Sequence, residues 1–314
     1  MDHIVKNGLT VSRLTLGTVQ LGLPYGIANK TGMPSEDESF EILEEAWNSG
    51  VVSFDTATAY GRSEEILGRY FKGKKPTIIT KLHVRPSPGA GSDEVEREMR
   101  AIVESSLCNL GIRSVPLLLL HNTDVLATHG DAVIAGFRSL KREGMIEYAG
   151  ISVSRNTDEE YRLIGDKLYD DTFEAVQFPL NILDHRPIRY GVLKRLKEAG
   201  KLVFARSLFL QGLIYLTERE LPEHLREASA LLAAIKELAQ RCGVSVSQMA
   251  VSFVRDLEGV DSLVIGAETP VQVRENVRLL VGPSLPESLT EEIMRRFSEV
   301  PDYIITPHLW KKGT

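Results

Sequence analysis

Several features are scarce in this chain of 314 residues, and each scarcity removes a class of protein. Only two cysteines occur, Cys108 and Cys242, far apart and without metal-ligand spacing, which fits a reducing compartment. No apolar run approaches the roughly 20 residues that cross a bilayer, so no membrane partner is expected. Basic residues (37) are fewer than acidic ones (43), and the formal net charge is -6. A nucleic-acid partner is therefore not expected.

The chain also shows no fixed-period repeat, no low-complexity tract and no linker that would divide it. Its N-terminus lacks the apolar core of a signal peptide, since Met1-Asp2-His3 leads directly into polar sequence. Hydrophobic residues make up 43% and charged residues 25%, which is ordinary for a soluble globular protein. The length suits an α/β barrel of roughly 250 residues with insertions. We therefore predict a cytoplasmic protein with one barrel domain over 1–314.

Short apolar runs alternate with longer segments of helical period, a pattern typical of a parallel sheet wrapped by helices. An Asn7-Gly8 pair between short apolar runs predicts a hairpin within 4–13 that plugs one end of the barrel. Extra helices are expected within 216–242, and the aromatic segment 301–310 is expected to pack back on the body. The prediction is an α/β fold, a (β/α)8 TIM barrel with an N-terminal β-hairpin and extra helices after strand 7 and at the C-terminus. The expected strands are 14–17, 51–54, 77–81, 115–121, 148–153, 175–178, 202–205 and 262–265, and the clearest expected helices are 36–48, 93–110, 131–143 and 187–199.

Ionisable residues stand at the ends of three successive predicted strands. Asp55 directly follows 51–54, Lys81 ends the next strand, and His121 ends the one after it. Tyr60 follows Asp55 in a turn that ends in Gly61. Because the active site of such a barrel lies at the C-terminal ends of its strands, these four side chains are expected to converge.

The four side chains together suit general acid–base chemistry on a carbonyl or an alcohol. A free phenol has a pKa of about 10, so Tyr60 needs tuning. An ammonium about 4 Å from the phenolate is worth roughly 4 kcal/mol at an effective dielectric of 20. We therefore predict that Lys81, held by Asp55, lowers the pKa of Tyr60 by about 1 to 3 despite burial. His121 is expected to hydrogen-bond the same substrate oxygen. Each residue alone has a structural interpretation, such as an Asx turn at Asp55, and their joint occurrence favours catalysis.

These residues also carry a family resemblance. The segments Phe54-Asp55-Thr56-Ala57 to Tyr60-Gly61, Thr80-Lys81 and Leu120-His121 resemble the catalytic tetrad of the aldo-keto reductases. The resemblance extends over nearly the whole chain. It implies hydride transfer between a nicotinamide cofactor, NAD(P)H, and an aldehyde, ketone or sugar-like substrate, with Tyr60 as general acid/base and no metal.

The resemblance further implies a set of cofactor contacts. Ser152 and Gln177 match the family residues that hold the nicotinamide carboxamide, and Asn276 is expected to bond the adenine. Asn181, Asp184 and Arg186, which follow Gln177, are interpreted as a structural loop. The implied cofactor-binding residues are Gly17, Thr18, Ser152, Gln177, Arg206, Ser207, Gln211, Gly212, Gly266, Glu268, Gln272, Glu275 and Asn276.

Three positions depart from the family pattern. Val153 follows Ser152 where many members have asparagine, and Arg206 stands where members usually have a tyrosine that stacks on the nicotinamide. A guanidinium can stack on a flat ring or anchor an anionic group. Glu268 lies just after the last strand, with no base before Arg274. Since a carboxylate repels a 2′-phosphate, we expect the unphosphorylated cofactor to be tolerated or preferred.

Two other functions remain open at this stage. One is a nicotinamide-binding regulatory subunit, because potassium-channel β-subunits resemble the same family. The other is a lyase or aldolase that forms a Schiff base on Lys81, which leaves Tyr60 and the C-terminal motif unexplained. Loops set specificity in such barrels, here 23–34, 83–92, 213–227 and the C-terminal tail. The polar segment 25–30 indicates a hydroxylated or sugar-like substrate.

Overall fold

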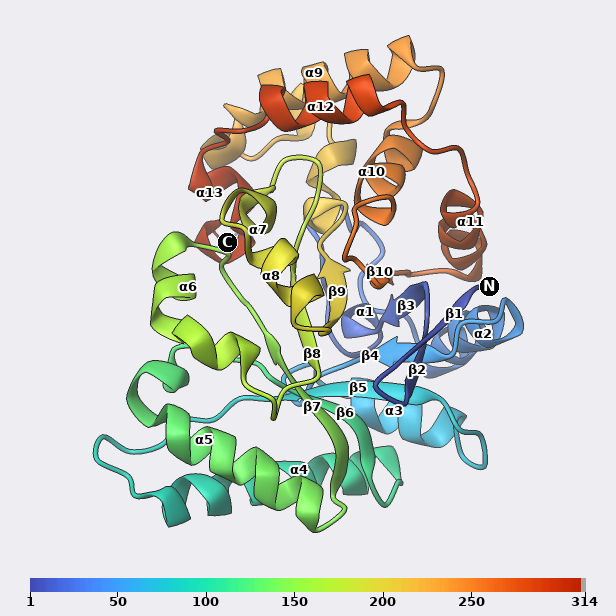
Figure 1. Ribbon diagram of the computed structural model, residues 1–314. Coiled ribbons are helices and arrows are strands. Elements are labelled where there is room, and N and C mark those ends of the chain that lie inside the picture. Colours follow the sequence, from blue (N-terminus) through green and yellow to red (C-terminus); the bar gives the residue numbers. More distant parts are fainter. Residues whose placement is uncertain (312–314) are drawn as a thin grey trace.

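Eight parallel strands close into a barrel, in the order β10-β3-β4-β5-β6-β7-β8-β9 (Figure 1). The computed structural model describes residues 1–311. Every strand lies within two residues of its predicted bounds, so the (β/α)8 prediction is confirmed. Apolar runs form these strands because both faces of a parallel barrel are buried. The barrel strands are β3 Leu14–Gly17, β4 Ser53–Asp55, β5 Thr77–Leu82, β6 Val115–Leu120, β7 Ile146–Ser152, β8 Ala175–Pro179, β9 Leu202–Arg206 and β10 Ser262–Gly266.

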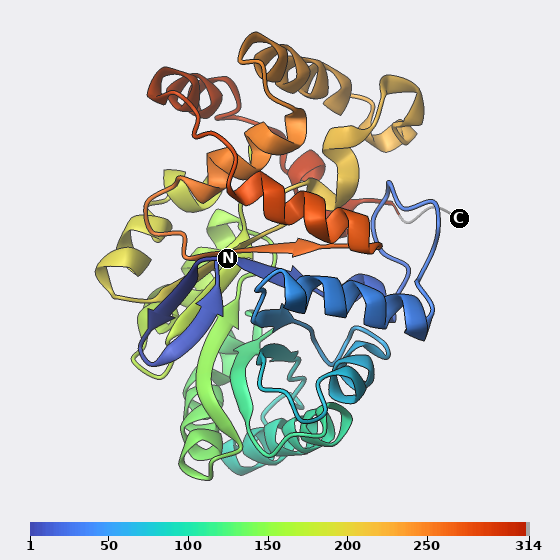
Figure 2. The ribbon, with the colours of Figure 1, turned by 90° about the vertical axis from the view of Figure 1, so that its right-hand side faces the viewer.

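A separate antiparallel hairpin precedes the barrel, formed by β1 (His3–Lys6) and β2 (Leu9–Ser12). Asn7 and Gly8 connect the strands with φ of 55° and 88°, which matches the two left-handed positions of a tight hairpin turn. Leu9 and Val11 are buried in one cluster with side chains from inside the barrel. The hairpin therefore closes one end of the barrel, as predicted (Figure 2).

Helices surround the barrel and extend it at one side (Figure 1). Helix α2 begins in a capping box, because the Ser35 hydroxyl accepts from the backbone N–H of Glu38 and the Glu38 carboxylate accepts from that of Ser35. The α-helices are α1 Val19–Gly22, α2 Glu36–Asn48, α3 Ser63–Tyr70, α4 Ser92–Leu110, α5 Val125–Arg142, α6 Asp158–Ile164, α7 Arg186–Arg189, α8 Val192–Glu198, α9 Ala228–Arg241, α10 Val246–Arg255, α11 Pro270–Leu280, α12 Glu287–Arg296 and α13 Asp302–Ile305. The 3-10 helices are η1 Gly165–Tyr169, η2 Leu210–Tyr215, η3 Glu218–Glu220, η4 Glu223–Leu225 and η5 Pro307–Leu309.

Two helices differ from their predicted bounds. The predicted helix 131–143 begins earlier, at Val125, and bends at His129, whose φ is −129°. The predicted helix 187–199 is divided into α7 and α8, because Gly191 between them has a left-handed φ of 70°. The extra helices expected within 216–242 are present as η3, η4 and α9. Within residues 1–311, no helix combines the length and the apolar character that a membrane span requires.

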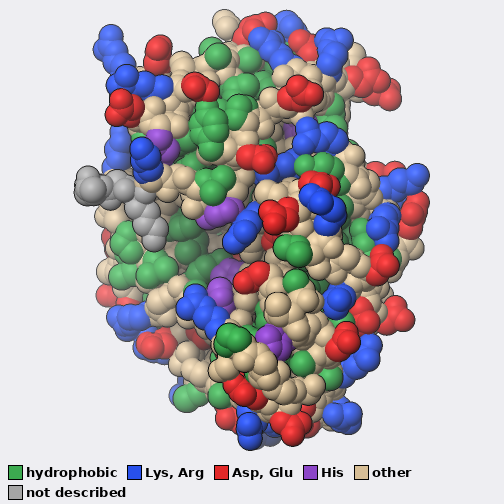
Figure 3. All heavy atoms as spheres, turned by 90° about the vertical axis from the view of Figure 1, so that its left-hand side faces the viewer, with side chains coloured by type: hydrophobic (Ala, Val, Ile, Leu, Met, Phe, Trp, Pro, Cys, Tyr) green, Lys and Arg blue, Asp and Glu red, His purple; other side chains and the backbone are tan. Residues whose placement is uncertain are grey.

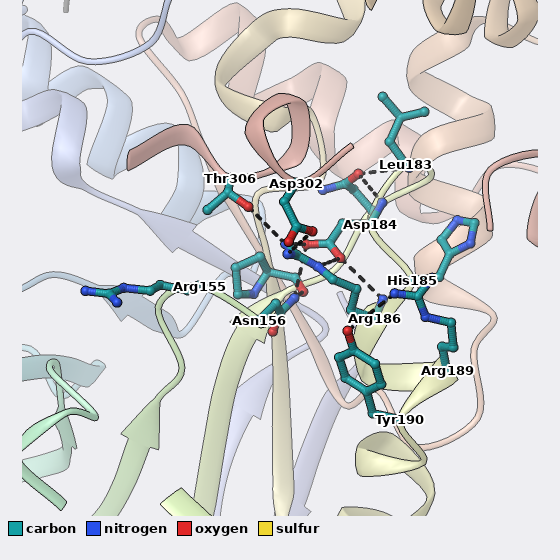
Figure 4. Close-up of polar contacts among 12 residues, drawn as sticks. Arg155, Asn156, Leu183, Asp184, His185, Arg186, Arg189, Tyr190, Asp302 and Thr306 are labelled. Carbon is teal, nitrogen blue, oxygen red and sulfur yellow. Dashed lines mark hydrogen bonds and ion pairs between the residues drawn. The ribbon is translucent and has the colours of Figure 1, made fainter. Parts of the chain in front are cut away.

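A buried ion pair ties the C-terminal segment to the loop after β8 (Figure 4). The Arg186 guanidinium donates to both carboxylate oxygens of Asp184, at 2.8 and 2.9 Å, and Asp184 is completely buried. Arg186 also donates to Asp302 at 3.0 Å and to the Thr306 hydroxyl at 3.3 Å. Asn156, in the loop after β7, donates to Asp184 at 3.2 Å. The predicted structural loop is therefore the anchor that places residues 301–310 beside the mouth of the barrel.

Replacement of Arg186 by methionine should leave the Asp184 carboxylate buried without its cation. We expect the free energy of unfolding, measured by urea denaturation, to fall by about 3–5 kcal/mol. Arg296→Met is the matched control, since Arg296 pairs with Glu237 on the surface and its loss should cost no more than about 1 kcal/mol. Equal losses in the two variants would show that Arg186 does not stabilise the fold through this pair.

Candidate active site

A buried ion pair lies at the C-terminal ends of β4 and β5. The Lys81 ammonium donates to both oxygens of the Asp55 carboxylate, at 2.7 and 2.6 Å, and to the carbonyl of Thr56 at 2.8 Å. Lys81 is 1% exposed and Asp55 4% exposed. All three protons of the ammonium are therefore used in hydrogen bonds inside the protein. Burial lowers the pKa of Lys81 below its ordinary value, and the Asp55 charge opposes this shift.

Two further polar side chains reach this pair from the opposite side of the barrel. The Gln177 amide, on β8, donates to Asp55 at 2.7 Å, and the Ser152 hydroxyl, on β7, donates to the Gln177 carbonyl at 3.3 Å. Ser152 and Gln177 were expected to hold the cofactor carboxamide. The structure buries both and gives Gln177 a contact with Asp55 that the sequence did not predict. Since a buried carboxylate needs hydrogen-bond donors, this contact completes the set around Asp55.

Tyr60 lies in the turn between β4 and α3, and the shape of that turn depends on two glycines. A Cβ atom on Gly22, at the end of α1, would lie 1.8 Å from the backbone oxygen of Tyr60, and Gly61 has a φ of 53°. The ring of Tyr60 lies 5.1 Å from the Lys81 ammonium and 6.1 Å from the His121 ring, to which it is nearly perpendicular. The structure therefore brings the four predicted catalytic residues together.

The electrostatic state of Tyr60 differs from the prediction. Burial raises the pKa of Tyr60 above its ordinary value, the Asp55 charge raises it further, and the Arg206 cation opposes both. The prediction that Lys81 lowers the pKa of Tyr60 is wrong here, because the Lys81 charge is offset by the carboxylate that it binds. The phenol is therefore held in its protonated form.

His121 follows β6 and is held by a backbone hydrogen bond from its N–H to the carbonyl of Leu82, at 2.7 Å. Burial, followed by the cations Lys81 and Arg206, lowers the pKa of His121 to about 3. Its imidazole is therefore neutral near neutral pH. Within residues 1–311, the buried Nδ1 atom of His121 has no hydrogen-bond partner. A neutral imidazole with unused bonding capacity thus stands beside the Tyr60 phenol.

Two cavities meet at Tyr60. The first, of about 780 Å³, extends from Asp55 and Tyr60 toward α11, and the second, of about 510 Å³, extends past His121 toward the C-terminal segment. The residues that border both are Tyr25, Tyr60, Arg206, Ser207 and Gln211. Of the predicted cofactor residues, those that line the first cavity are Gly17, Thr18, Arg206, Ser207, Gln211, Gly212, Gly266, Glu268, Gln272, Glu275 and Asn276. Ser152 and Gln177 line neither cavity.

The segment after β9 has an unusual backbone where it borders the first cavity. Ser207, Leu210, Gln211 and Gly212 all have positive φ, between 46° and 92°. Left-handed conformation is costly for residues other than glycine, and such strain clusters at functional sites. The segment is held by a loop on the other side of the cavity, since the backbone N–H of Ile27 donates to the Gln211 carbonyl at 3.1 Å. The first cavity is therefore bridged by contacts between the loops after β3 and β9.

Comparison with known proteins agrees with this geometry. The model of the aldo/keto reductase family matches residues 13–295. The chain belongs to the aldo/keto reductase family. It is 28% identical to the uncharacterized oxidoreductase YqkF of Bacillus subtilis, with 96% of each chain covered. It is 24% identical to the uncharacterized oxidoreductase YrpG of the same organism, with 95% of this chain and 94% of that one covered.

Solved structures show the same fold. The holo form of the aldo-keto reductase AKR11C1 from Bacillus halodurans superposes with a TM-score of 0.73 at 23% identity, with 94% of this chain and 96% of that one covered. The glycerol dehydrogenase AKR11B4 from Gluconobacter oxydans superposes with a TM-score of 0.72 at 23% identity, with 96% and 97% covered. These two similarities support the barrel assignment.

The far end of the first cavity in this aldo-keto reductase contains both signs of charge. Asn276 donates to the carbonyl of Gly266 at 3.2 Å, and the backbone N–H of Glu268 donates to the Gln272 side chain at 2.6 Å. Arg274, the nearest base expected from the sequence, instead pairs with Glu45 on α2 at 2.6 Å. Arg278 lines the cavity and was missed. The helical period could have found it, because Arg278 lies one turn after Glu275 on the same face of α11.

The predicted specificity loop 23–34 reaches the site through Tyr25. Tyr25 borders both cavities, and burial raises its pKa to about 12. Gln20, on α1, was missed; it lines the first cavity, and its side chain occupies the space that a Cβ atom on Gly266 would need. Within residues 1–311, no group of three or more His, Cys, Asp or Glu side chains is arranged to hold a metal ion. The segment after β3 thus contributes both Gln20 and Tyr25 to the lining of the first cavity.

The lowered pKa of His121 predicts a specific dependence of stability on pH. An unfolded histidine takes up a proton near pH 6.5, whereas the folded one does so near pH 3. Stability should therefore decrease as the pH falls from about 6.5 toward 3, by up to about 1.4 kcal/mol per pH unit from this group. Urea denaturation at pH 7, 6 and 5 should show a steeper loss in the wild type than in His121→Gln. His3→Gln, at an exposed position, is the matched control, and parallel curves for wild type and His121→Gln would refute the prediction.

Proposed function

We propose that this aldo-keto reductase transfers a hydride between a nicotinamide cofactor and a carbonyl or alcohol substrate, with Tyr60 as the general acid/base. Membership of the family makes the protein an oxidoreductase acting on such substrates. The observation that carries the proposal is the position of Tyr60 at the junction of two cavities. One cavity is lined by the predicted cofactor residues other than Ser152 and Gln177, and the other by His121.

The first cavity suits a nicotinamide dinucleotide. Its lining joins the left-handed segment after β9 to the Gly266–Asn276 region, so it offers backbone groups, hydroxyls and amides along its length. In the proposal, Ser207, Gln211 and Gly212 contact the pyrophosphate and Asn276 contacts the adenine. The cofactor supplies the hydride when bound, and the protein supplies orientation and proton transfer.

Tyr60 donates the proton to the substrate oxygen in the direction of reduction. Its raised pKa keeps the proton on the phenol until the oxygen becomes basic. The Arg206 cation then stabilises the phenolate that remains. His121 donates a hydrogen bond to the same oxygen as a neutral imidazole, and Asp55 holds Lys81 beneath the Tyr60 ring. In alcohol oxidation the phenolate accepts the proton instead.

The geometry of Lys81 argues against the Schiff-base alternative. A lysine nucleophile must be neutral and accessible, whereas Lys81 is 1% exposed and its ammonium binds Asp55 and the carbonyl of Thr56. Attack on a substrate carbonyl would require the loss of these three hydrogen bonds. Turnover of a substrate by the wild type decides between the enzyme and the regulatory-subunit alternative.

Removal of the Tyr60 hydroxyl should abolish most of the activity and leave cofactor binding intact. We expect kcat of Tyr60→Phe to fall by about 10²- to 10⁴-fold, assayed with aldehydes, ketones and sugars and both nicotinamide cofactors. The dissociation constant of the reduced cofactor, from fluorescence titration, should change less than twofold. Wild-type kcat in Tyr60→Phe would refute the role of Tyr60. Tight cofactor binding without turnover of any substrate by the wild type would favour a regulatory subunit.

We further propose that the unphosphorylated cofactor is tolerated or preferred. The Glu268 carboxylate lines the first cavity near its far end, and Arg274 is engaged by Glu45. A repulsion of about 1 kcal/mol between the Glu268 carboxylate and a 2′-phosphate corresponds to roughly a fivefold change in affinity. Glu268→Gln should therefore raise kcat/KM for the phosphorylated cofactor about fivefold and change that for the unphosphorylated one less than twofold. Arg278→Gln is the opposing variant and should lower kcat/KM for the phosphorylated form. A clear kinetic preference of the wild type for the phosphorylated cofactor would overturn the proposal.

A further inference from the structure

The second cavity is lined by two guanidinium groups and three imidazole rings. Arg155, Arg206, His83 and His308 border it together with His121. Figure 3 shows histidine side chains around a hollow in one face of the molecule, with both Lys or Arg and Asp or Glu side chains next to them. Three carboxylates, those of Asp124, Glu159 and Glu160, line the same cavity. Attraction of an anionic group therefore depends on cations that these carboxylates do not pair with.

The loop that carries Arg155 is rigidly held. The Glu160 carboxylate, at the start of α6, accepts the backbone N–H groups of Ser154, Arg155 and Asn156 at 2.9, 2.7 and 2.8 Å. The Asn156 side chain donates to Asp184 in the buried network. Because the Glu160 carboxylate accepts these three backbone hydrogen bonds, its charge stabilises the conformation of the loop. Arg155 is thus presented from a preorganised backbone.

The Arg155 side chain is directed away from the acidic residues of that network. Figure 4 shows it pointing away from Asp184 and Arg186. Within residues 1–311, no carboxylate lies within 4.0 Å of the guanidinium of Arg155. Asp124 and Glu159 also line the cavity; like Arg155 they are exposed to solvent, and neither pairs with Arg155. Arg155 is therefore a solvent-exposed guanidinium without a carboxylate partner among residues 1–311.

Arg206 lies against the same loop. Its guanidinium donates to the carbonyls of Val153 and Ser154 at 2.9 and 3.5 Å, and to the Ser207 hydroxyl at 3.2 Å. These acceptors are neutral, so the charge of Arg206 is also uncompensated among the residues described. Its contacts with Val153 and Ser154 place it next to the backbone of Arg155. The loop after β7 thus places two guanidinium groups at the cavity. Arg155 is part of the loop, and Arg206 is hydrogen-bonded to it.

We propose that the second cavity binds substrates that carry a carboxylate or phosphate group, which Arg155 and Arg206 recognise while the carbonyl faces Tyr60 and His121. The proposal rests on the proposed function, since it names the substrate class of the same site. Guanidinium groups match both oxyanions in shape and charge. Arg155 and His308 line only the second cavity, whereas the predicted adenosine contacts line only the first. The group that Arg155 binds therefore belongs to the substrate.

Matched pairs of substrates test the proposal. Glyceraldehyde is compared with glyceraldehyde 3-phosphate, and butanal with succinic semialdehyde. The wild type should show a kcat/KM at least tenfold higher for the anionic member of one or both pairs. The pair that shows the effect identifies phosphate or carboxylate as the favoured group. Equal kcat/KM within both pairs would overturn the proposal.

Variants separate recognition from a general loss of activity. Arg155→Gln should lower kcat/KM for the preferred anionic substrate about tenfold, and change that for its neutral partner and the KM for cofactor less than twofold. Arg113→Gln is the control, because Arg113 is exposed and precedes β6 at the other end of the barrel. Equal losses for the anionic and neutral substrates in Arg155→Gln would contradict the assignment.

A binding measurement keeps the test independent of turnover. Malonate and inorganic phosphate should bind the wild type in calorimetric titrations, and at least one should bind about tenfold more weakly to Arg155→Gln. If no carbonyl compound is turned over, the proposed function fails, yet this titration still decides whether the anion site exists. Equal affinity of wild type and Arg155→Gln for both anions would count against the site.

Discussion

Burial of the Asp55–Lys81 ion pair is the constraint on which the rest of the site depends. Removing a carboxylate and an ammonium from water costs several kcal/mol for each ion, and the cost is offset only when both are fully hydrogen-bonded. Here Lys81 has three acceptors, and Asp55 receives the lysine and the Gln177 amide. These bonds join β4 and β5 to β8 across the barrel. The ion pair therefore fixes the relative positions of these strand ends at the mouth of the barrel as well as the charge there.

The same pairing determines which cation acts on Tyr60. Because Asp55 offsets the charge of Lys81, burial dominates the state of Tyr60 and keeps its phenol protonated. Arg206, whose guanidinium pairs with no carboxylate among the residues described, acts on both Tyr60 and His121, and Lys81 acts on His121 as well. The sequence resemblance implies a stacking tyrosine at the position of Arg206. A guanidinium at this position places a fixed positive charge beside the reacting groups.

The barrel and the convergence of the tetrad could be predicted from the sequence because their signals are local. An apolar run that ends in Asp55, Lys81 or His121 marks both a strand and its C-terminal end, and the barrel topology brings those ends together. The contact of Gln177 with Asp55 joins residues 122 positions apart, and no local pattern indicates it. The pKa of Tyr60 was mispredicted because it depends on the balance between burial and paired charges. The break at Gly191 was missed because a glycine within a helical pattern does not itself reveal a left-handed φ.

Arg206 borders both cavities, and this position has a thermodynamic consequence. A negative group that enters either cavity reduces the positive potential that the next group meets in the other. By linkage, the free energy of this interaction is the same whichever ligand binds first. Two anionic ligands would therefore weaken each other through Arg206, whereas an anionic and a cationic ligand would bind cooperatively. The position of the Arg206 guanidinium between the two cavities thus makes their affinities interdependent.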